Sequence, residues 1–116
     1  MFKNILLPTD GSAASDTAIQ AVVRLARDMG ARITGMHVVP PFHTFTYRPD
    51  MLEDTPERYE KDSGEQARQI LMTIELQAQE CGVECETIVV RSDDVYKAIL
   101  DTAAGRQCDV IAMASH

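Results

Sequence analysis

The first twelve residues constrain the fold most, because a short apolar run is followed at once by turn residues. Ile5-Leu6-Leu7 is short enough for a strand that is buried on both faces. Pro8 ends the pairing of that strand, since proline has no N–H to donate. Asp10-Gly11 is typical of a turn, and Ser12 or Ser15 can cap a following helix. This stretch therefore predicts a strand, a tight polar loop and a helix N-terminus in direct succession.

A helical pattern follows this loop and ends at Gly30, a residue type that suits the left-handed position after a helix. Apolar residues recur along one stripe of this helix, at Ala18, Val22, Leu25, Ala26 and Met29. Residues 32–39 then predict a second strand, which Pro40-Pro41 closes. A helix between two buried strands indicates a βαβ unit with a right-handed crossover.

The same alternation of helix and strand continues to the end of the sequence. Residues 63–81 predict a second helix, with a buried stripe at Ala67, Ile70, Leu71, Ile74, Ala78 and Cys81. Residues 85–90 predict a third strand, Asp93 or Asp94 caps a third helix, and residues 109–114 predict a fourth strand. We therefore expect a single α/β domain over residues 1–116, in which a parallel sheet carries helices on both faces.

Residues 41–62 interrupt this alternation and predict a long irregular connection with a helical turn near its end. Three prolines and four of the six aromatic residues of the chain lie in this segment, among acidic residues. Connections of this length usually pack as a surface flap or carry function. Two interpretations stay open: a flap that packs its aromatic side chains on the body of the domain, and a lid or partner-binding surface.

The net charge of −7 argues against binding of nucleic acid or of an anionic membrane, because both require a basic face. No apolar run is long enough to span a membrane, and the N-terminus lacks the pattern of a signal peptide. The odd number of cysteines predicts a cytoplasmic protein with reduced thiols. Cys81, Cys85 and Cys108 lack a fourth ligand and the usual zinc spacing, so we predict no metal site.

Several nucleotide-binding and catalytic patterns are missing from the sequence. It contains neither a P-loop nor a Gly-x-Gly-x-x-Gly after the first strand. A phosphorylated receiver domain needs an acidic cluster, and Asp10 has no acidic neighbour in its loop. His37 is interpreted as a core histidine that bonds to the backbone. His116 lacks a visible nucleophile or orienting partner, so no catalytic residue is predicted.

The succession of elements and five sequence blocks resemble the universal stress protein family. The resemblance covers residues 3–116 apart from the connection at 41–62. The blocks that carry it are Ile5-Leu6-Leu7-Pro8-Thr9-Asp10-Gly11-Ser12, Gly30-Ala31, Met36-His37-Val38-Val39-Pro40, Ile99 with Ala103, and Asp109-Val110-Ile111-Ala112-Met113-Ala114-Ser115-His116.

The resemblance implies a flavodoxin-like parallel sheet of strand order 3-2-1-4-5, with ATP held between the loops after strands one and four. Pro8, Thr9 and Asp10 would then line the adenosine side, and the backbone of Val38 would meet the adenine. The last three residues of the sequence would lead into the phosphate loop. The expected nucleotide-binding residues are Pro8, Thr9, Asp10, Gly11, Ser12, Val38, Val39, Ala114, Ser115 and His116.

One part of the family pattern falls beyond the sequence. The family's glycine-rich ATP signature directly follows the fourth strand, and the sequence ends before its first glycine. The fifth strand, which commonly builds the family's dimer interface, would also come later. We therefore expect that these 116 residues are not the whole gene product.

Three functions follow from the resemblance. The first is a cytoplasmic stress-response module that binds ATP, with or without Mg²⁺, and acts as a homodimer. The second is a dimeric stress protein that binds no nucleotide and acts through protein partners. The third is an enzyme with weak ATP hydrolysis or adenylation activity, but Thr9-Asp10-Gly11-Ser12 does not match the Ser-Gly-Gly-x-Asp-Ser loop of the adenylating relatives.

Overall fold

The computed structural model describes residues 3–11, 13–41 and 56–113 of the chain. The elements are β1 (Asn4–Pro8), α1 (Ala13–Met29), β2 (Arg32–Val39), α3 (Pro56–Glu80), β3 (Cys85–Arg91), α4 (Val95–Gly105) and β4 (Val110–Ile111). All three strand pairs are parallel, and the strand order is β3-β2-β1-β4. The expected flavodoxin-like α/β fold, with strand order 3-2-1-4, is confirmed.

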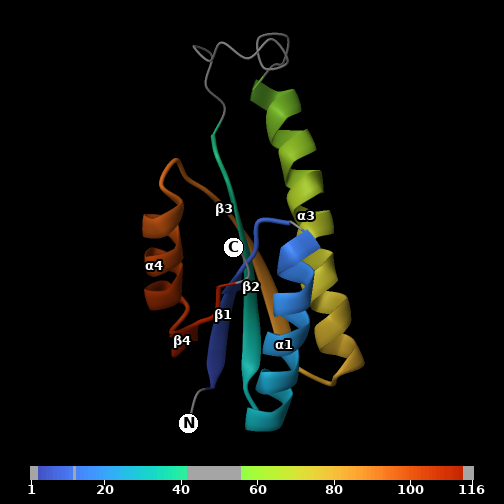
Figure 1. Cartoon of the computed structure of the whole chain (residues 1–116). Helices are drawn as coiled ribbons and strands as arrows, with labels where there is room; N and C mark the ends of the chain where they lie inside the picture. The colour runs from blue at the N-terminus through green and yellow to red at the C-terminus, as the bar shows by residue number, and fades with distance from the viewer. Residues whose placement is uncertain (1–2, 12, 42–55, 114–116) are drawn as a thin grey trace.

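The helices cover both faces of the sheet, with α1 and α3 on one face and α4 on the other (Figure 1). Both faces of the sheet must be covered because β1 places apolar side chains on each of them. Side chains alternate along a strand, so Ile5 and Leu7 point towards α1 and α3 while Leu6 points towards α4. All three side chains are buried, which places β1 at the centre of the fold.

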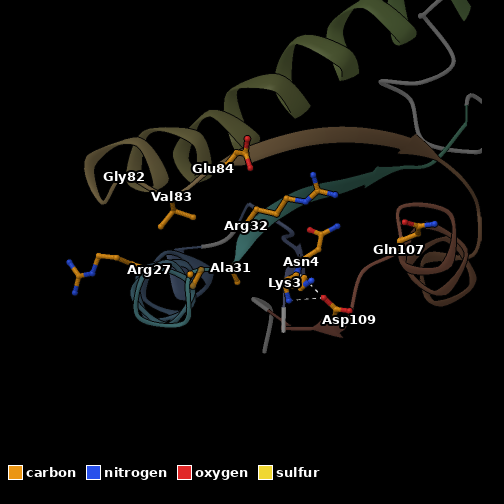
Figure 2. A pocket seen from close by; sticks show the side chains of 12 residues that line it. Lys3, Asn4, Arg27, Ala31, Arg32, Gly82, Val83, Glu84, Gln107 and Asp109 are labelled. Atoms are coloured by element: carbon orange, nitrogen blue, oxygen red, sulfur yellow. Dashed lines mark hydrogen bonds between the residues drawn. The ribbon is translucent and has the colours of Figure 1, made fainter. Parts of the chain in front are cut away.

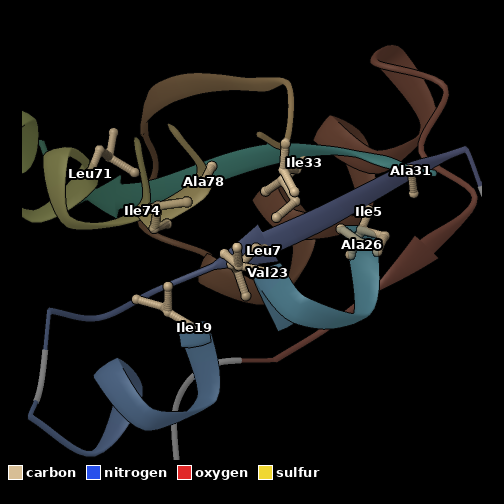
Figure 3. Packing of buried hydrophobic residues seen from close by; sticks show 11 residues of the cluster. Ile5, Leu7, Ile19, Val23, Ala26, Ala31, Ile33, Leu71, Ile74 and Ala78 are labelled. Carbon is tan, nitrogen blue, oxygen red and sulfur yellow. The ribbon is translucent and has the colours of Figure 1, made fainter. Parts of the chain in front are cut away.

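The larger core lies between the sheet and the pair of helices α1 and α3 (Figure 3). Its members are Ile5, Leu7, Ile19, Val23, Ala26, Ala31, Ile33, Leu71, Ile74, Ala78 and Val83. A smaller core under α4 consists of Leu6, Met36, Ala98 and Ile99. The buried stripe predicted for α3 is confirmed at Ala67, Leu71, Ile74 and Ala78.

Four of the five residues of the stripe predicted for α1 face the core: Ala26 is buried, and Ala18, Val22 and Met29 pack against the core partly buried. Ile19, Val23 and Ala26 form the buried face of this helix, whereas Leu25 is 51% exposed. Helix α1 packs against α3 as well as against the sheet, so its buried face is turned towards both neighbours. The 3.6-residue period alone cannot give that direction, because two adjacent apolar stripes fit the same sequence.

Two boundaries differ from those expected. Helix α3 begins at Pro56 rather than at residue 63, so the end of the connection at 41–62 is helical. Proline suits the first turn of a helix, where its missing N–H has no partner to lose. Residues 42–55 lie outside the described residues. Strand β4 covers only Val110–Ile111 instead of 109–114, and β1 is its one neighbour in the described part of the sheet.

Hydrogen bonds from polar side chains hold the amino ends of β1 and β2 in place. The carboxylate of Asp109 accepts hydrogen bonds from the backbone N–H of Lys3, at 2.7 Å, and of Asn4, at 2.9 Å (Figure 2). The buried Asn4 side chain accepts a bond from Thr34 Oγ1 and donates one to the Arg106 carbonyl. This network joins β1, β2 and the turn before β4 at one end of the sheet, and it leaves the Asn4 amide satisfied.

Candidate functional site

A pocket of about 130 Å³ lies at the carboxyl ends of β1 and β2, on the face of the sheet that α4 covers. Most of its wall is apolar, and Thr9 and Asp10 bring polar groups to it. Its lining residues are Pro8, Thr9, Asp10, Met36, His37, Val38, Val95, Ile99 and Met113. Open parallel sheets bind ligands at the carboxyl ends of their strands, so this pocket is the candidate functional site.

The pocket brings together four of the ten predicted site residues, namely Pro8, Thr9, Asp10 and Val38. Gly11 lies in the same loop but lines a different hollow, and Val39 is buried and does not line the pocket. The remaining four predicted residues, Ser12, Ala114, Ser115 and His116, lie outside the described residues. The structure therefore describes the side of the predicted site that follows β1 and β2.

Thr9 is anchored to strand β2 through both of its backbone groups. Its N–H donates to the Met36 carbonyl at 2.9 Å, and its carbonyl accepts a bond of 2.8 Å from Nδ1 of His37. Its hydroxyl oxygen also accepts a bond from the Gly11 N–H at 3.2 Å. These contacts confirm the expected backbone bond of His37, and they hold the loop that carries Asp10 at the pocket mouth.

Gly11 makes the close turn after Asp10 with a φ of +80°, a backbone conformation that favours glycine. On this side of the loop, α1 and α3 enclose a second hollow of about 310 Å³. Its lining is mainly polar and includes Asp16, Gln66, Gln69 and Thr73. The loop after β1 thus separates an apolar pocket on the α4 face from a polar hollow on the α1/α3 face.

Helix α4 supplies part of the pocket wall through Val95 and Ile99. Asp94 caps this helix, because its side chain accepts a bond from the Lys97 N–H at 3.1 Å. The sequence analysis did not assign these residues, nor Met36 and Met113, to the site. A signal was available for α4: a helix that crosses back over a parallel sheet begins at the carboxyl ends of the strands.

The three cysteines of the chain are unpaired and half-buried. Burial, reinforced by the nearby Glu75 carboxylate, raises the pKa of the Cys85 thiol to about 11. Burial also raises the pKa of Cys108. Protonated thiols are poor nucleophiles and poor metal ligands near neutral pH. Within residues 3–11, 13–41 and 56–113, no three His, Cys, Asp or Glu side chains gather where they could hold a metal ion.

A larger hollow of about 640 Å³ lies at the opposite end of the sheet, around the amino ends of β1 and β2 (Figure 2). Basic and acidic side chains line it together, among them Lys3, Arg27, Arg32, Glu84 and Asp109. The Asp109 carboxylate already accepts two backbone bonds there. This hollow lies away from the end of a parallel sheet at which ligands bind, so we do not assign the site to it.

Comparison with known proteins finds one matching protein family. The model of the universal stress protein family matches residues 1–116. A solved structure of a protein from that family, from Burkholderia pseudomallei, is 27% identical with a TM-score of 0.80, over 99% of this chain and 83% of that one. The comparison with curated proteins gave no match.

Two further solved structures share the fold at lower identity, and both contain an adenine nucleotide. A universal stress protein in complex with cAMP is 16% identical with a TM-score of 0.68, over 95% of this chain and 70% of that one. The universal stress protein from Archaeoglobus fulgidus in complex with dAMP is 16% identical with a TM-score of 0.65. That match covers 97% of this chain and 80% of the other.

Proposed function

Because this chain belongs to the universal stress protein family, we propose that it binds an adenine nucleotide, ATP, in the pocket between β1, β2 and α4. The observation that carries the proposal is the pocket itself. An apolar wall with a few polar groups at its edge, at the carboxyl ends of parallel strands, is the arrangement typical of a nucleotide base site. The cAMP and dAMP complexes of structures with the same fold support this choice of ligand.

In this proposal the apolar side chains take the flat faces of the base, and polar groups orient the rest of the nucleotide. The carboxylate of Asp10 accepts hydrogen bonds from the ribose hydroxyls. The backbone of Val38 meets the edge of the adenine, while Val95 and Ile99 close the pocket from α4. The phosphates extend towards the residues that follow β4; Ala114, Ser115 and His116, which the resemblance assigns to the approach to the phosphate loop, lie outside the described residues.

We assign the protein a regulatory role in a stress response rather than a catalytic one. The described lining of the pocket contains no Ser, Cys or Lys, and the Nδ1 of His37 there donates to the Thr9 carbonyl rather than pairing with a hydroxyl. The module acts in the cytoplasm, as a homodimer, and its nucleotide state is the signal. No helix within the described residues is long and apolar enough to cross a membrane.

The test is equilibrium binding of Mg-ATP to the longest natural form of the protein, with one site variant and one matched control. Asp10→Ala removes the proposed ribose acceptor and should weaken binding about tenfold or more, the loss expected for a hydrogen bond to a charged group. Asp16→Ala removes an exposed carboxylate of α1 that lines the other hollow, and it should leave the affinity unchanged. Absence of ATP binding, or equal losses in the two variants, contradicts the proposal.

An interaction protein without a nucleotide is the second candidate, and exposed apolar side chains on α4 favour it. Tyr96 is 74% exposed and Leu100 is 44% exposed, and they lie one helical turn apart. Exposed apolar neighbours of this kind are typical of protein contact sites. If the full-length protein binds no ATP but Tyr96→Ala and Leu100→Ala abolish its self-association, this second candidate replaces the first.

A further inference from the structure

We infer that His37 is the positioning residue of the candidate site, which holds the loop carrying Asp10 in the geometry that binds the nucleotide. This inference rests on the function proposed above. It assigns to His37 a role in ligand affinity that the residue performs through Thr9 rather than through its own contact with the ligand.

The direction of the His37 side chain aims its imidazole at the loop after β1. His37 lies between Met36 and Val38 on β2, and these two side chains pack in the core under α4. Because successive side chains of a strand point to opposite faces, the His37 side chain points to the α1/α3 face. From there its Nδ1 reaches the Thr9 carbonyl at 2.8 Å. His37 belongs to the lining of the pocket, and its imidazole acts on the loop through the Thr9 carbonyl.

The direction of this hydrogen bond shows that a residue substituted for His37 must supply a donor. A carbonyl oxygen can only accept, so Nδ1 of His37 carries the proton and donates it to Thr9. The Thr9 N–H is already bound to the Met36 carbonyl. Two consecutive residues of β2 thus hold the two backbone groups of Thr9, and the next residue along the loop is Asp10. Loss of the donor at residue 37 frees one of these two anchors.

Two variants of His37 distinguish the effect of losing the hydrogen-bond donor from the effect of losing the ring. His37→Phe keeps a ring of similar size and removes the donor, whereas His37→Asn removes the ring and places an amide N–H₂ close to the position of Nδ1. We expect His37→Phe to weaken the binding of Mg-ATP by about three- to tenfold, the usual range for one lost hydrogen bond. We expect the affinity of His37→Asn to stay within about twofold of the parent protein, because the donor is restored.

A double-mutant cycle with Asp10→Asn distinguishes positioning from a general structural effect. If His37 acts by placing Asp10, the loss caused by His37→Phe should disappear once Asp10 is replaced. A general loss of stability would instead lower the affinity by the same factor in both backgrounds. The inference is overturned if His37→Phe leaves the affinity unchanged, or if its loss of affinity is just as large in the Asp10→Asn background. In either case, ATP binding by the parent protein leaves the proposed function intact.

A measurement without ligand tests the role of His37 separately from the proposed ATP binding. The Gly11 amide is bound to Thr9 Oγ1, so its hydrogen exchange reports whether the loop is held. Exchange at Gly11 should be several-fold faster in His37→Phe and close to the parent rate in His37→Asn. If the parent protein binds no ATP, the proposed function fails; equal exchange rates in the parent, Phe and Asn proteins overturn the role of His37 independently.

Discussion

Gly11 lies directly against Ile70 of α3: a Cβ added to Gly11 would stand 2.8 Å from Ile70 Cδ1 and 3.0 Å from Ile70 Cγ1. The loop after β1 is therefore held on two sides. His37 binds it from β2, and the side chain of Ile70 packs against its glycine from α3. A loop that carries a ligand contact is most useful when the rest of the fold defines its position before the ligand arrives.

Gly11→Ala should destabilise the protein more than Gly30→Ala does. Both glycines have a positive φ, of +80° and +69°, but nothing lies within 4 Å of a Cβ at Gly30. Gly30→Ala should therefore cost only the left-handed backbone, about 1 kcal/mol. Gly11→Ala should cost about 1 kcal/mol more, because Ile70 must move. Urea unfolding measures both, and Ile70→Val, which lacks Cδ1, should recover part of the difference. Equal losses would contradict this account.

Asp109→Asn should reduce the stability of the protein at neutral pH and make it less sensitive to acid. The backbone N–H groups of Lys3 and Asn4 hold the pKa of Asp109 below its ordinary value of 3.8. A carboxylate whose folded-state pKa is lowered stabilises the fold above the unfolded pKa, and this stabilisation is lost as the pH falls through the folded value. The free energy of unfolding, measured from pH 7 down to about pH 2, should fall less steeply in Asp109→Asn. Asp101→Asn, at an exposed position on α4, is the control and should keep the parental slope.

The thiol of Cys85 should be slow to alkylate at pH 8, and Glu75→Gln should speed the reaction. With a pKa of about 11, Cys85 should react on the order of a hundredfold more slowly than a free cysteine, whose pKa is about 8.5. Burial is the larger cause of the raised pKa and persists in the variant, so we expect an acceleration of only a few-fold. The measurement is the rate of iodoacetamide labelling in a Cys81→Ser, Cys108→Ser background. Glu65→Gln on the same helix should not change the rate, and an unchanged rate in Glu75→Gln would refute the electrostatic part of the explanation.

Asp94→Ala should loosen the start of α4 and weaken the pocket wall that this helix supplies. The Asp94 carboxylate caps the Lys97 N–H, and loss of such a cap typically costs about 1 kcal/mol. Val95 follows the cap directly and lines the pocket. Thermal unfolding should therefore show the loss of stability, and Mg-ATP titration should show a weaker affinity. Asp94→Asn should keep most of both properties, since Asn is an equally good cap; identical behaviour of the two variants would argue against the cap.

Local patterns were sufficient to predict the strands and most of their bounds, whereas the strand order followed from the family resemblance. The apolar run of β1, the β-rich stretch of β2 and the glycine after α1 each have one dominant interpretation, and the structure confirms them. The extent of β4 was overestimated, because an apolar sequence continues beyond the two residues that pair with β1. Whether an apolar residue pairs in a sheet depends on its neighbours in space, and these do not appear in the local sequence.

The site was predictable only where its residues follow a strand. Pro8 ends β1 and Thr9 and Asp10 follow it, so the geometry of parallel sheets was enough to place them at the pocket. Val95 and Ile99 come from a helix whose distance from β1 depends on the packing of α4 over Leu6. The bond from His37 to Thr9 joins strand β2 to the loop after β1, and no spacing within either segment indicates that Thr9 is the partner. Contacts between segments, rather than patterns within them, account for what sequence reasoning missed.

The central position of β1 has a consequence for the synthesis of the chain. β1 is translated before both of its neighbours in the sheet, which are residues 32–36 on one side and 110–111 on the other. At about 5 to 20 residues per second, roughly 5 to 20 s pass between the translation of β1 and that of β4. During this interval one edge of β1 has no strand beside it, and α4 has not yet covered Leu6. The nascent chain therefore exposes a short, apolar, half-paired strand, and chaperones that hold such segments should act on this protein before β4 is made.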